Sequence, residues 1–337
     1  MKTILVPTDY SRQAQNALSY ALEIAKETKA EIILFHAFYK TIYTPDTVEI
    51  DTMIAAMEAE KCRELEKYAE TAKQALCKDF AMQFISTEKV SSEAEALLTQ
   101  TKSGFHRIEL DTALAKKEDV KIRCVARFGL AFDQILIATQ LYKADLVIMG
   151  MKGKGAFSSV FLGNTTIAVI QDSPVPVLAV PTDVPYKVLK NVVLALNLTL
   201  LPSNIALNWL RDFVAVIKSK LQVLHLYQEG SQQEVRDKAY KALDTLDVHL
   251  HDITYKVVFK QRDDVAEGLQ QYVQEQRSDL LILIPSQHTF LEKLLNKSIV
   301  GKLSAQANVP LLSLPSQQKQ RVQLLAEEAL AEEAAND

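Results

Sequence analysis

The chain has 337 residues, which is long enough for two domains of ordinary size, each with its own hydrophobic core. A formal net charge of −4, without a basic stripe carrying interleaved aromatic residues, argues against a protein that binds nucleic acid electrostatically. Pro7 and Asp9 interrupt the start before a signal-peptide core could form, and no run of about 18 apolar residues occurs, so we expect a soluble, cytoplasmic protein.

The first half of the chain alternates apolar runs with helical patterns, which predicts βαβ units around a parallel sheet. We expect strands at residues 2–9, 32–38, 120–126, 146–149 and 177–180. We expect helices at residues 11–28, 48–76 and 130–142. Gly150 is expected to end the fourth of these strands, where the backbone would turn toward a helix.

The second half opens in the same way and predicts a second sheet. Its expected strands are residues 190–197, 221–227, 253–259 and 311–314, together with the run that begins at Leu280. Its expected helices are residues 202–219, 232–246 and 264–276. His36 and His225 fall at matching places in the second strand of each half, and five parallel strands per half are expected.

An internal repeat connects the two halves, because residues 144–181 align without a gap on residues 278–315. The two copies share an apolar framework and an aspartate: Asp145 matches Asp279, Leu146 matches Leu280, and Val175-Pro176 matches Val309-Pro310. The three glycines of the motif in the first copy are replaced in the second: Gly150 by Ile284, Gly153 by Gln287, and Gly163 by Lys297. The chain is therefore predicted to be a duplication in which one half has kept a ligand loop.

The repeat sets the predicted domains. The first covers residues 1–182 and carries an insertion at 80–119, which could be a lid, a partner surface or a neutral elaboration. The second, degenerate domain covers residues 187–316 after a short linker bracketed by prolines. Residues 317–337 form a tail rich in alanine and glutamate, expected either as a solvated acidic tail or as a loosely docked helix.

The glycine loop predicts an anion site. The spacing Gly150-x2-Gly153-x9-Gly163-Asn164 follows a buried strand and precedes a helix start. Glycines let backbone amides approach an anion, and a helix N-terminus adds unpaired N–H groups, so phosphate is the natural ligand. Lys152 and Lys154 flank Gly153 and could either meet phosphate charge or be ordinary exposed lysines.

Three segments together resemble the universal stress protein family in tandem form. They are the opening run Ile4-Leu-Val-Pro-Thr-Asp9-Tyr-Ser11, the run Leu34-Phe-His36-Ala37, and the glycine motif followed by Pro174-Val-Pro176-Val-Leu. The resemblance implies two tandem five-stranded parallel α/β domains of Rossmann-like fold. Because the short linker cannot separate the two halves far, they are expected to pack as a pseudo-dimer. The resemblance also implies ATP binding in the half that keeps the glycine motif, with Mg²⁺ or Mn²⁺ as the accompanying ion. Because ATP-binding members often form dimers, a homodimer of chains is a further expectation.

Carried over by position, the resemblance assigns the nucleotide-binding residues. They are Pro7, Thr8, Asp9, Ala37, Met149, Gly150, Gly153, Gly163, Asn164 and Thr165. Asp9 and the backbone near Ala37 would lie at the ribose and adenine, and the residues from Gly153 to Thr165 would hold the triphosphate. Asn164 departs from the family pattern, which usually has Ser or Thr there. An amide can still donate to a phosphate oxygen but supplies no hydroxyl for a metal-bound phosphate.

Several candidates also have a structural interpretation. Asp9 could be the N-cap of the following helix, and His36 is read as scaffold because His225 matches it in the half without glycines. His249 and His251 would share one strand face but lack a third metal ligand. The three cysteines, Cys62, Cys77 and Cys124, are expected to be reduced and partly buried.

The sequence therefore favours a cytoplasmic, ATP-binding regulatory or sensor protein of the stress response, with nucleotide in the N-terminal half only. No catalytic residue and no metal ligand is assigned. Two alternatives stay open: a slow ATPase or adenylate-transferring enzyme, and a structural interaction protein that binds no nucleotide. Because no general base is placed beside the loop, efficient hydrolysis is not expected.

Overall fold

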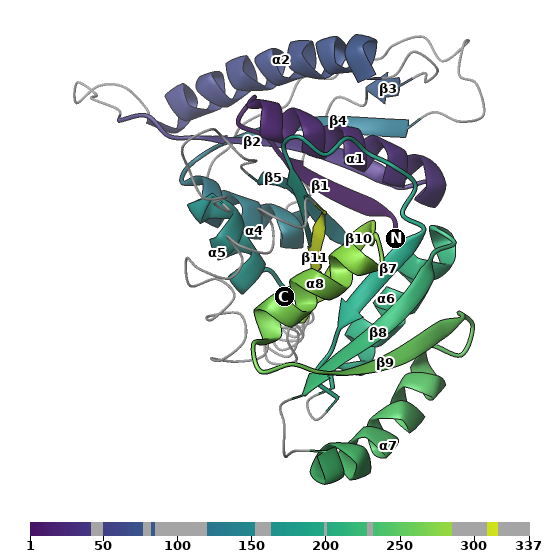
Figure 1. The fold of residues 1–337 in the computed structure, drawn as a ribbon. Helices are drawn as coiled ribbons and strands as arrows, with labels where there is room; N and C mark the ends of the chain where they lie inside the picture. Colours follow the sequence, from purple (N-terminus) through teal and green to yellow (C-terminus); the bar gives the residue numbers. More distant parts are fainter. Residues whose placement is uncertain are drawn as a thin grey trace, which may run out of the picture. The chain divides into compact units, whose positions relative to one another are not determined.

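The computed structural model describes residues 1–41, 50–76, 82–84, 120–151, 163–198, 201–227, 232–284 and 309–315 (Figure 1). The chain divides into two compact units, Met1–Met149 and Gly150–Asp337. The domain boundary expected from the repeat, between residues 182 and 187, stays a prediction. Among the described residues, no helix is both long and apolar enough to cross a membrane.

The first unit is a parallel sheet with helices on both faces. Its strands are β1 (Thr3–Pro7), β2 (Glu31–Phe38), β3 (Met82–Phe84), β4 (Val120–Phe128) and β5 (Leu146–Met151), in the order β3-β4-β2-β1-β5. All the strand pairs that define this order are parallel. Its helices are α1 (Arg12–Thr28), α2 (Ile50–Leu76) and α4 (Ala131–Leu141), with α1 and α2 on one face of the sheet and α4 on the other (Figure 1).

The sequence explains these elements locally. Ile4, Leu5 and Val6 of β1 are fully buried because helices cover both faces of a parallel sheet. Helix α1 begins after Ser11, whose hydroxyl accepts a hydrogen bond from the Ala14 N–H at 3.3 Å and so caps the helix. These elements position the turn that follows β1.

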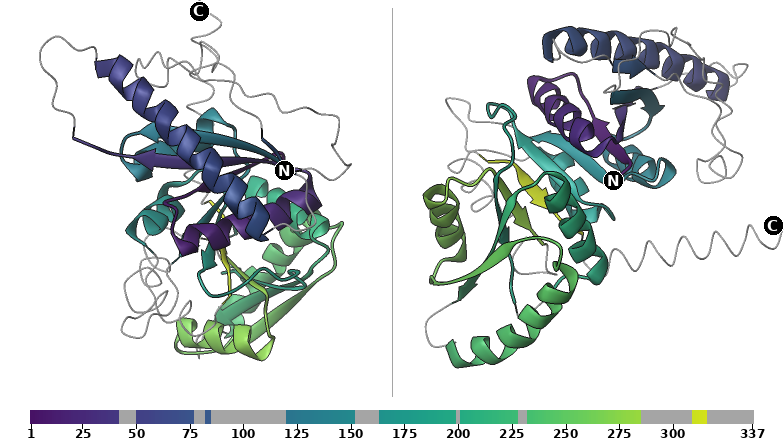
Figure 2. Two further views of the ribbon diagram at one scale, coloured as in Figure 1. Left: turned by 90° about the horizontal axis from the view of Figure 1, so that it is seen from above. Right: turned by 90° about the vertical axis from the view of Figure 1, so that its right-hand side faces the viewer.

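The second unit contains the strands of the second half of the chain together with β6. Its strands are β6 (Val177–Pro181), β7 (Asn191–Ala195), β8 (Lys220–Tyr227), β9 (Tyr255–Gln261), β10 (Leu280–Leu283) and β11 (Leu311–Ser313). Its helices are α5 (Asn164–Asp172), α6 (Asn204–Val216), α7 (Gln232–His249) and α8 (Val265–Glu275) (Figure 2). The order is β6-β11-β10-β7-β8-β9, and the five strands from β11 to β9 are all parallel, as predicted for the second half of the chain.

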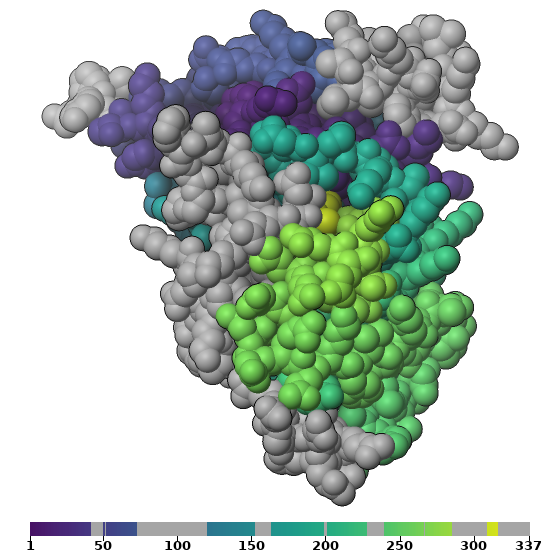
Figure 3. Space-filling view, viewed as in Figure 1, coloured from purple at the N-terminus to yellow at the C-terminus, as the bar shows by residue number. Residues whose placement is uncertain are grey.

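Strands β6 and β11 pair antiparallel, with Val177 opposite Ser313 and Leu178 opposite Leu312. They are the last strands of the two repeats. Both are buried, and only a small part of β11 is visible beside α8 in the space-filling view (Figure 3).

The matched aspartates of the repeat perform the same task in each copy. Asp145 Oδ2 accepts the N–H of Thr3 at 2.9 Å, and Asp279 Oδ2 accepts the N–H of Asn191 at 2.9 Å. In addition, the Asp145 N–H donates to the Thr3 carbonyl, and the Asp279 N–H donates to the Asn191 carbonyl. The duplication is thus present in side-chain hydrogen bonds as well as in the fold, which is the Rossmann-like α/β fold that the sequence predicted.

The predicted end of strand β5 was wrong. Strand β5 does not end at Gly150 but continues to Met151, whose carbonyl accepts the Thr182 hydroxyl at 3.0 Å. The expected insertion contains a strand, because Met82–Phe84 pairs with Val120–Ile122 at the start of β4. The rest of the expected insertion lies outside the described residues.

A glycine that the sequence argument did not use shapes the turn after β4. Gly129 has a φ of +141°, and a Cβ placed there would lie 2.7 Å from the Gln134 Nε2 atom. A side chain at this position would strain the backbone and would require the Gln134 side chain to move.

Candidate functional site

The turn after β1 is held by a set of hydrogen bonds. The Thr8 N–H donates to the Phe35 carbonyl at 2.8 Å, and the Thr8 hydroxyl accepts the Tyr10 N–H at 3.0 Å. Asp9 Oδ1 accepts the Ser11 N–H at 3.0 Å and also contacts the Ser11 hydroxyl. The Asp9 side chain is exposed, so its second carboxylate oxygen can face a ligand.

These contacts correct the structural alternative for Asp9. The N-cap of α1 is Ser11, not Asp9, because the Ser11 hydroxyl lies over the first helical amides. Asp9 instead orients the capping residue through one carboxylate oxygen. Binding through the other oxygen is compatible with this role.

Ala37 and Met149 lie at the same edge of the sheet as Pro7. Pro7 is level with Phe35 in the β1–β2 register, so Ala37 extends two residues beyond the end of β1. Met149 follows the β5 residue Val147, which pairs with Leu5 of β1. Within the first unit, the structure thus gathers the predicted residues Pro7, Thr8, Asp9, Ala37 and Met149 at the carboxyl ends of β1, β2 and β5. This edge is where ligands bind in sheets of this type.

In the second unit, the predicted phosphate residues lie around the N-terminus of α5. Gly163 is the N-cap and has no side chain to accept a helical N–H, and Asn164 and Thr165 form the first turn. Buried Thr166, which the sequence argument did not assign, donates its hydroxyl to the Gly150 carbonyl at 3.2 Å. The start of α5 is therefore tied to the glycine that follows Met149, with helical amides available to an anion.

Several predicted residues lie outside the described part of the chain. They are Lys152, Gly153, Lys154, Gln287, Lys297 and Cys77. The predicted roles of these residues stay predictions. Ile284, the counterpart of Gly150, is described and half-buried.

His36 and His225 confirm the scaffold interpretation. The His36 Nδ1–H donates to the Thr8 carbonyl at 2.8 Å. In the second repeat, His225 Nδ1 lies 3.1 Å from the carbonyl of Leu196, the residue that matches Thr8. Burial lowers the pKa of His225, which keeps its ring neutral near pH 7. Both histidines therefore fasten the second strand of their repeat to the end of the first.

Aromatic residues that the sequence argument did not assign surround the turn. The Tyr10 ring lies 4.6 Å from the His36 ring and 5.2 Å from the Tyr68 ring, centroid to centroid. Tyr68 belongs to α2, which is distant in sequence, so sequence spacing gave no signal for this contact. Burial raises the pKa of Tyr10 and of Tyr68, so both phenols stay protonated near neutral pH.

The two described cysteines are free, as expected. The Cys62 thiol donates to the Cys124 carbonyl at 3.3 Å, and burial raises the pKa of Cys62 to about 12. A thiol with such a pKa is almost entirely protonated at pH 7, which makes it a poor nucleophile.

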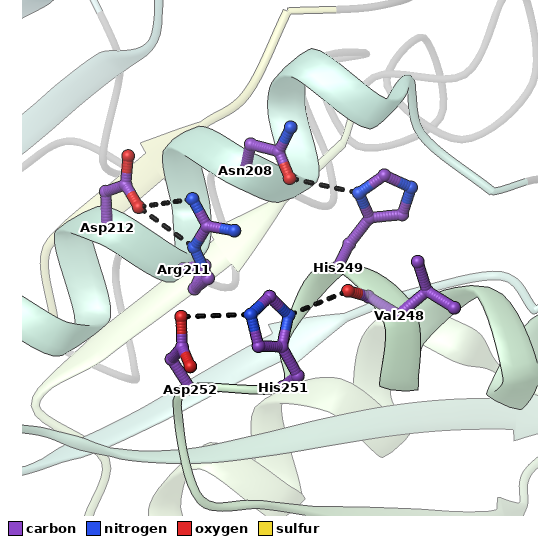
Figure 4. Close-up of polar contacts among 7 residues, drawn as sticks. All are labelled: Asn208, Arg211, Asp212, Val248, His249, His251 and Asp252. Atoms are coloured by element: carbon purple, nitrogen blue, oxygen red, sulfur yellow. Dashed lines mark hydrogen bonds and ion pairs between the residues drawn. The ribbon is translucent and has the colours of Figure 1, made fainter.

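The expectation that His249 and His251 share a strand face was wrong. His249 ends α7, and His251 lies in the turn after it, because the buried Leu250 continues the helical hydrogen bonding to Leu246. The two rings have separate partners: His249 bonds to Asn208 and His251 to Val248 and Asp252 (Figure 4). In the described part of the chain, no group of three or more His, Cys, Asp or Glu residues could hold a metal ion.

Comparison with known proteins gives a family match over the first half of the chain. The model of the universal stress protein family matches residues 1–181. A universal stress protein of Methanocaldococcus jannaschii is 26% identical over 179 residues, which are 53% of this chain and 81% of the relative.

Solved structures extend the similarity in fold. A universal stress protein from Archaeoglobus fulgidus covers 93% of this chain and 98% of its own, with a TM-score of 0.61 and 17% identity. A universal stress protein solved in complex with cAMP covers 54% of this chain and 98% of its own, with a TM-score of 0.31 and 17% identity. The Archaeoglobus structure therefore shares its fold with nearly the whole of this chain.

Proposed function

This chain belongs to the universal stress protein family, and from that premise we propose that it binds one molecule of ATP in its first repeat. The role is that of a cytoplasmic regulator or sensor of the stress response. The second repeat, whose glycines are replaced, serves as a structural partner.

The observation that carries the proposal is the position of Asp9. Its Oδ1 is occupied by Ser11, while the exposed carboxylate stands at the carboxyl edge of β1, level with the end of β2. A carboxylate accepts hydrogen bonds from the two hydroxyls of a ribose, and the backbone near Ala37 can bond to the polar edge of a base. The nucleoside is therefore proposed to bind at the first unit's sheet edge.

The phosphates are assigned to the glycine motif. The start of α5 offers the amides of Asn164 and Thr165 and the positive end of the helix dipole, and Gly163 places no side chain over them. Gly153 and its flanking lysines would complete the loop. The described carboxylates form no metal cluster, so Mg²⁺ or Mn²⁺ would be held mainly by the phosphates.

A titration of the purified chain with ATP tests this assignment. Calorimetry is expected to give one nucleotide per chain, because the second repeat has Ile284, Gln287 and Lys297 at the glycine positions. Beforehand, a separate sample of the protein is denatured and the nucleotide that it releases is measured by chromatography. This counts any nucleotide that stayed bound during purification. Two equivalent sites would refute the restriction to one repeat, and no binding would select the structural alternative. Steady release of ADP would select the slow ATPase.

We further propose that the two repeats, residues 1–182 and 187–316, form a pseudo-dimer within one chain, with the acidic tail 317–337 outside both. The antiparallel pairing of β6 with β11 supports this, since these are the last strands of the two repeats. The linker is short and fastened at its far end by Lys187, whose ammonium lies 2.7 Å from the Asp279 carboxylate.

A pair of cysteines placed across these strands tests the pseudo-dimer. Val177→Cys with Ser313→Cys joins directly opposite residues, so mild oxidation is expected to form an intrachain disulfide detectable by mass spectrometry. Val177→Cys with Leu311→Cys is the mismatched control, because Leu311 lies opposite Ala179. A disulfide between two chains would instead indicate that the strands pair in a homodimer.

A further inference from the structure

Tyr10 has an unusual backbone conformation. Five described residues other than glycine have a positive φ. Four of them follow the ends of α1, α4, α6 and α8, where a left-handed residue commonly terminates a helix: Lys29, Lys143, Lys218 and Arg277. Tyr10, with a φ of 63°, is the exception, since it lies in the turn between β1 and α1. For an aromatic residue this conformation is strained and needs support from its surroundings.

The support comes from the Tyr10 side chain. Its ring contacts His36 of β2 and, edge to face, Tyr68 of α2, at centroid distances of 4.6 Å and 5.2 Å. The ring contacts of such pairs stabilise by packing, not through the phenol. The buried Tyr10 hydroxyl finds no hydrogen-bond partner among the described residues. The ring itself therefore anchors the turn.

The second repeat does not share this feature. Leu198 occupies the position that matches Tyr10 and does not have a positive φ. Its N–H instead lies 3.3 Å from His225 Nδ1, the counterpart of the His36 ring that Tyr10 contacts. The strained turn thus occurs in the repeat that retains the glycine motif and Asp9. Because the strained turn and the proposed ligand residues occur in the same repeat, we attribute the strain to ligand binding and not to a requirement of the fold.

We propose that Tyr10 is a positioning residue: its ring, held between His36 and Tyr68, fixes the left-handed turn that presents Asp9 to the nucleotide. This inference rests on the proposed function. The ring contacts offset the backbone strain, and the fixed backbone keeps Asp9 Oδ1 on Ser11 while the other oxygen faces outward. Without the ring, Asp9 would have to be ordered again at each binding event.

Three substitutions separate positioning from general stability. Tyr10→Gly keeps the left-handed backbone accessible but removes the ring that anchors the turn. Tyr10→Phe keeps that ring. Lys29→Gly is the matched control, because it relieves backbone strain at another left-handed residue, at the end of α1. Because ordering one residue costs roughly 1–2 kcal/mol, the Kd of Tyr10→Gly for ATP is expected to rise about tenfold. Tyr10→Phe and Lys29→Gly are expected to bind as the unmodified chain does.

A second measurement does not depend on nucleotide. Hydrogen exchange of the Ser11 amide, which donates to Asp9 Oδ1, reports the turn in the free protein. We expect this protection to fall in Tyr10→Gly and to persist in Tyr10→Phe and Lys29→Gly. Unchanged protection in Tyr10→Gly would overturn the positioning role. If the unmodified chain binds no nucleotide, the proposed function fails while the exchange experiment still decides the role of Tyr10 in the turn. Should Tyr10→Gly not fold, Tyr10→Asn provides the same test, since asparagine tolerates the left-handed region.

Discussion

Replacing Gly163 with valine is expected to abolish ATP binding while leaving the chain folded. The backbone at Gly163 is not left-handed, and a Cβ placed there would have as its nearest contact the Thr166 hydroxyl, at 4.0 Å. The free protein therefore has room for a side chain at this position. A valine would nevertheless stand over the first amides of α5, where the phosphates are proposed to bind. Affinity is expected to fall by at least about a hundredfold, equivalent to ~2.7 kcal/mol, in a calorimetric titration.

The folded state of this variant is checked by its thermal unfolding. Exchange of glycine for valine at a helix N-cap costs about 1 kcal/mol, so only a modest fall in the melting temperature is expected. Lys297→Val, at the matching position of the second repeat, is the control and should bind ATP normally. If Gly163→Val binds ATP as tightly as the unmodified chain, the phosphates are not at this helix. Gly163→Ala, with its smaller side chain, should give an intermediate loss.

Much of the fold could be predicted because its signals are local. Apolar runs such as Ile4 to Val6 are read directly from neighbouring residues. The repeat added a second line of evidence, since Asp145 and Asp279 were matched in sequence and make the same backbone bonds in the structure. The errors occurred where tertiary contacts decide. Leu250 is buried and keeps His249 in a helix, although the alternation around it suggested a strand.

The candidate site was predictable only in part, for the same reason. Asp9, Ala37 and Met149 could be placed because each lies at or next to the carboxyl end of an expected strand, and parallel strands end at a common edge. Tyr68 and Thr166 could not be assigned, because their contacts with Tyr10 and Gly150 depend on how a helix packs against a distant turn. The strain at Tyr10 also has no sequence signature, since most residues before Ser11 would give the same helix start.

The contact between α2 and the end of β4 is a further feature that only the structure reveals. Glu58 and Arg127 are 4% and 6% exposed, and Glu58 Oε2 lies 3.2 Å from Arg127 Nη1. Glu58 Oε1 accepts the Phe128 N–H at 2.9 Å. One turn further along α2, Cys62 donates to the Cys124 carbonyl. Side chains of α2 thus bond to the backbone of β4 along the strand that pairs with β2.

Glu58→Ala is therefore expected to destabilise the chain by about 3–5 kcal/mol, the usual cost of removing one member of a buried ion pair. The loss arises because the Arg127 guanidinium stays buried without this carboxylate and the Phe128 N–H loses its acceptor. The matched control is Glu64→Ala on the same helix, which breaks the Lys61–Glu64 pair, where the side chains are 35% and 45% exposed. That exposed pair should contribute no more than about 1 kcal/mol.

Urea unfolding of both variants measures the difference in their free energies of unfolding. Adding Arg127→Met to Glu58→Ala should recover part of the lost stability, because it removes the buried charge. Equal unfolding midpoints for Glu58→Ala and Glu64→Ala would show that the buried pair does not hold α2 to β4.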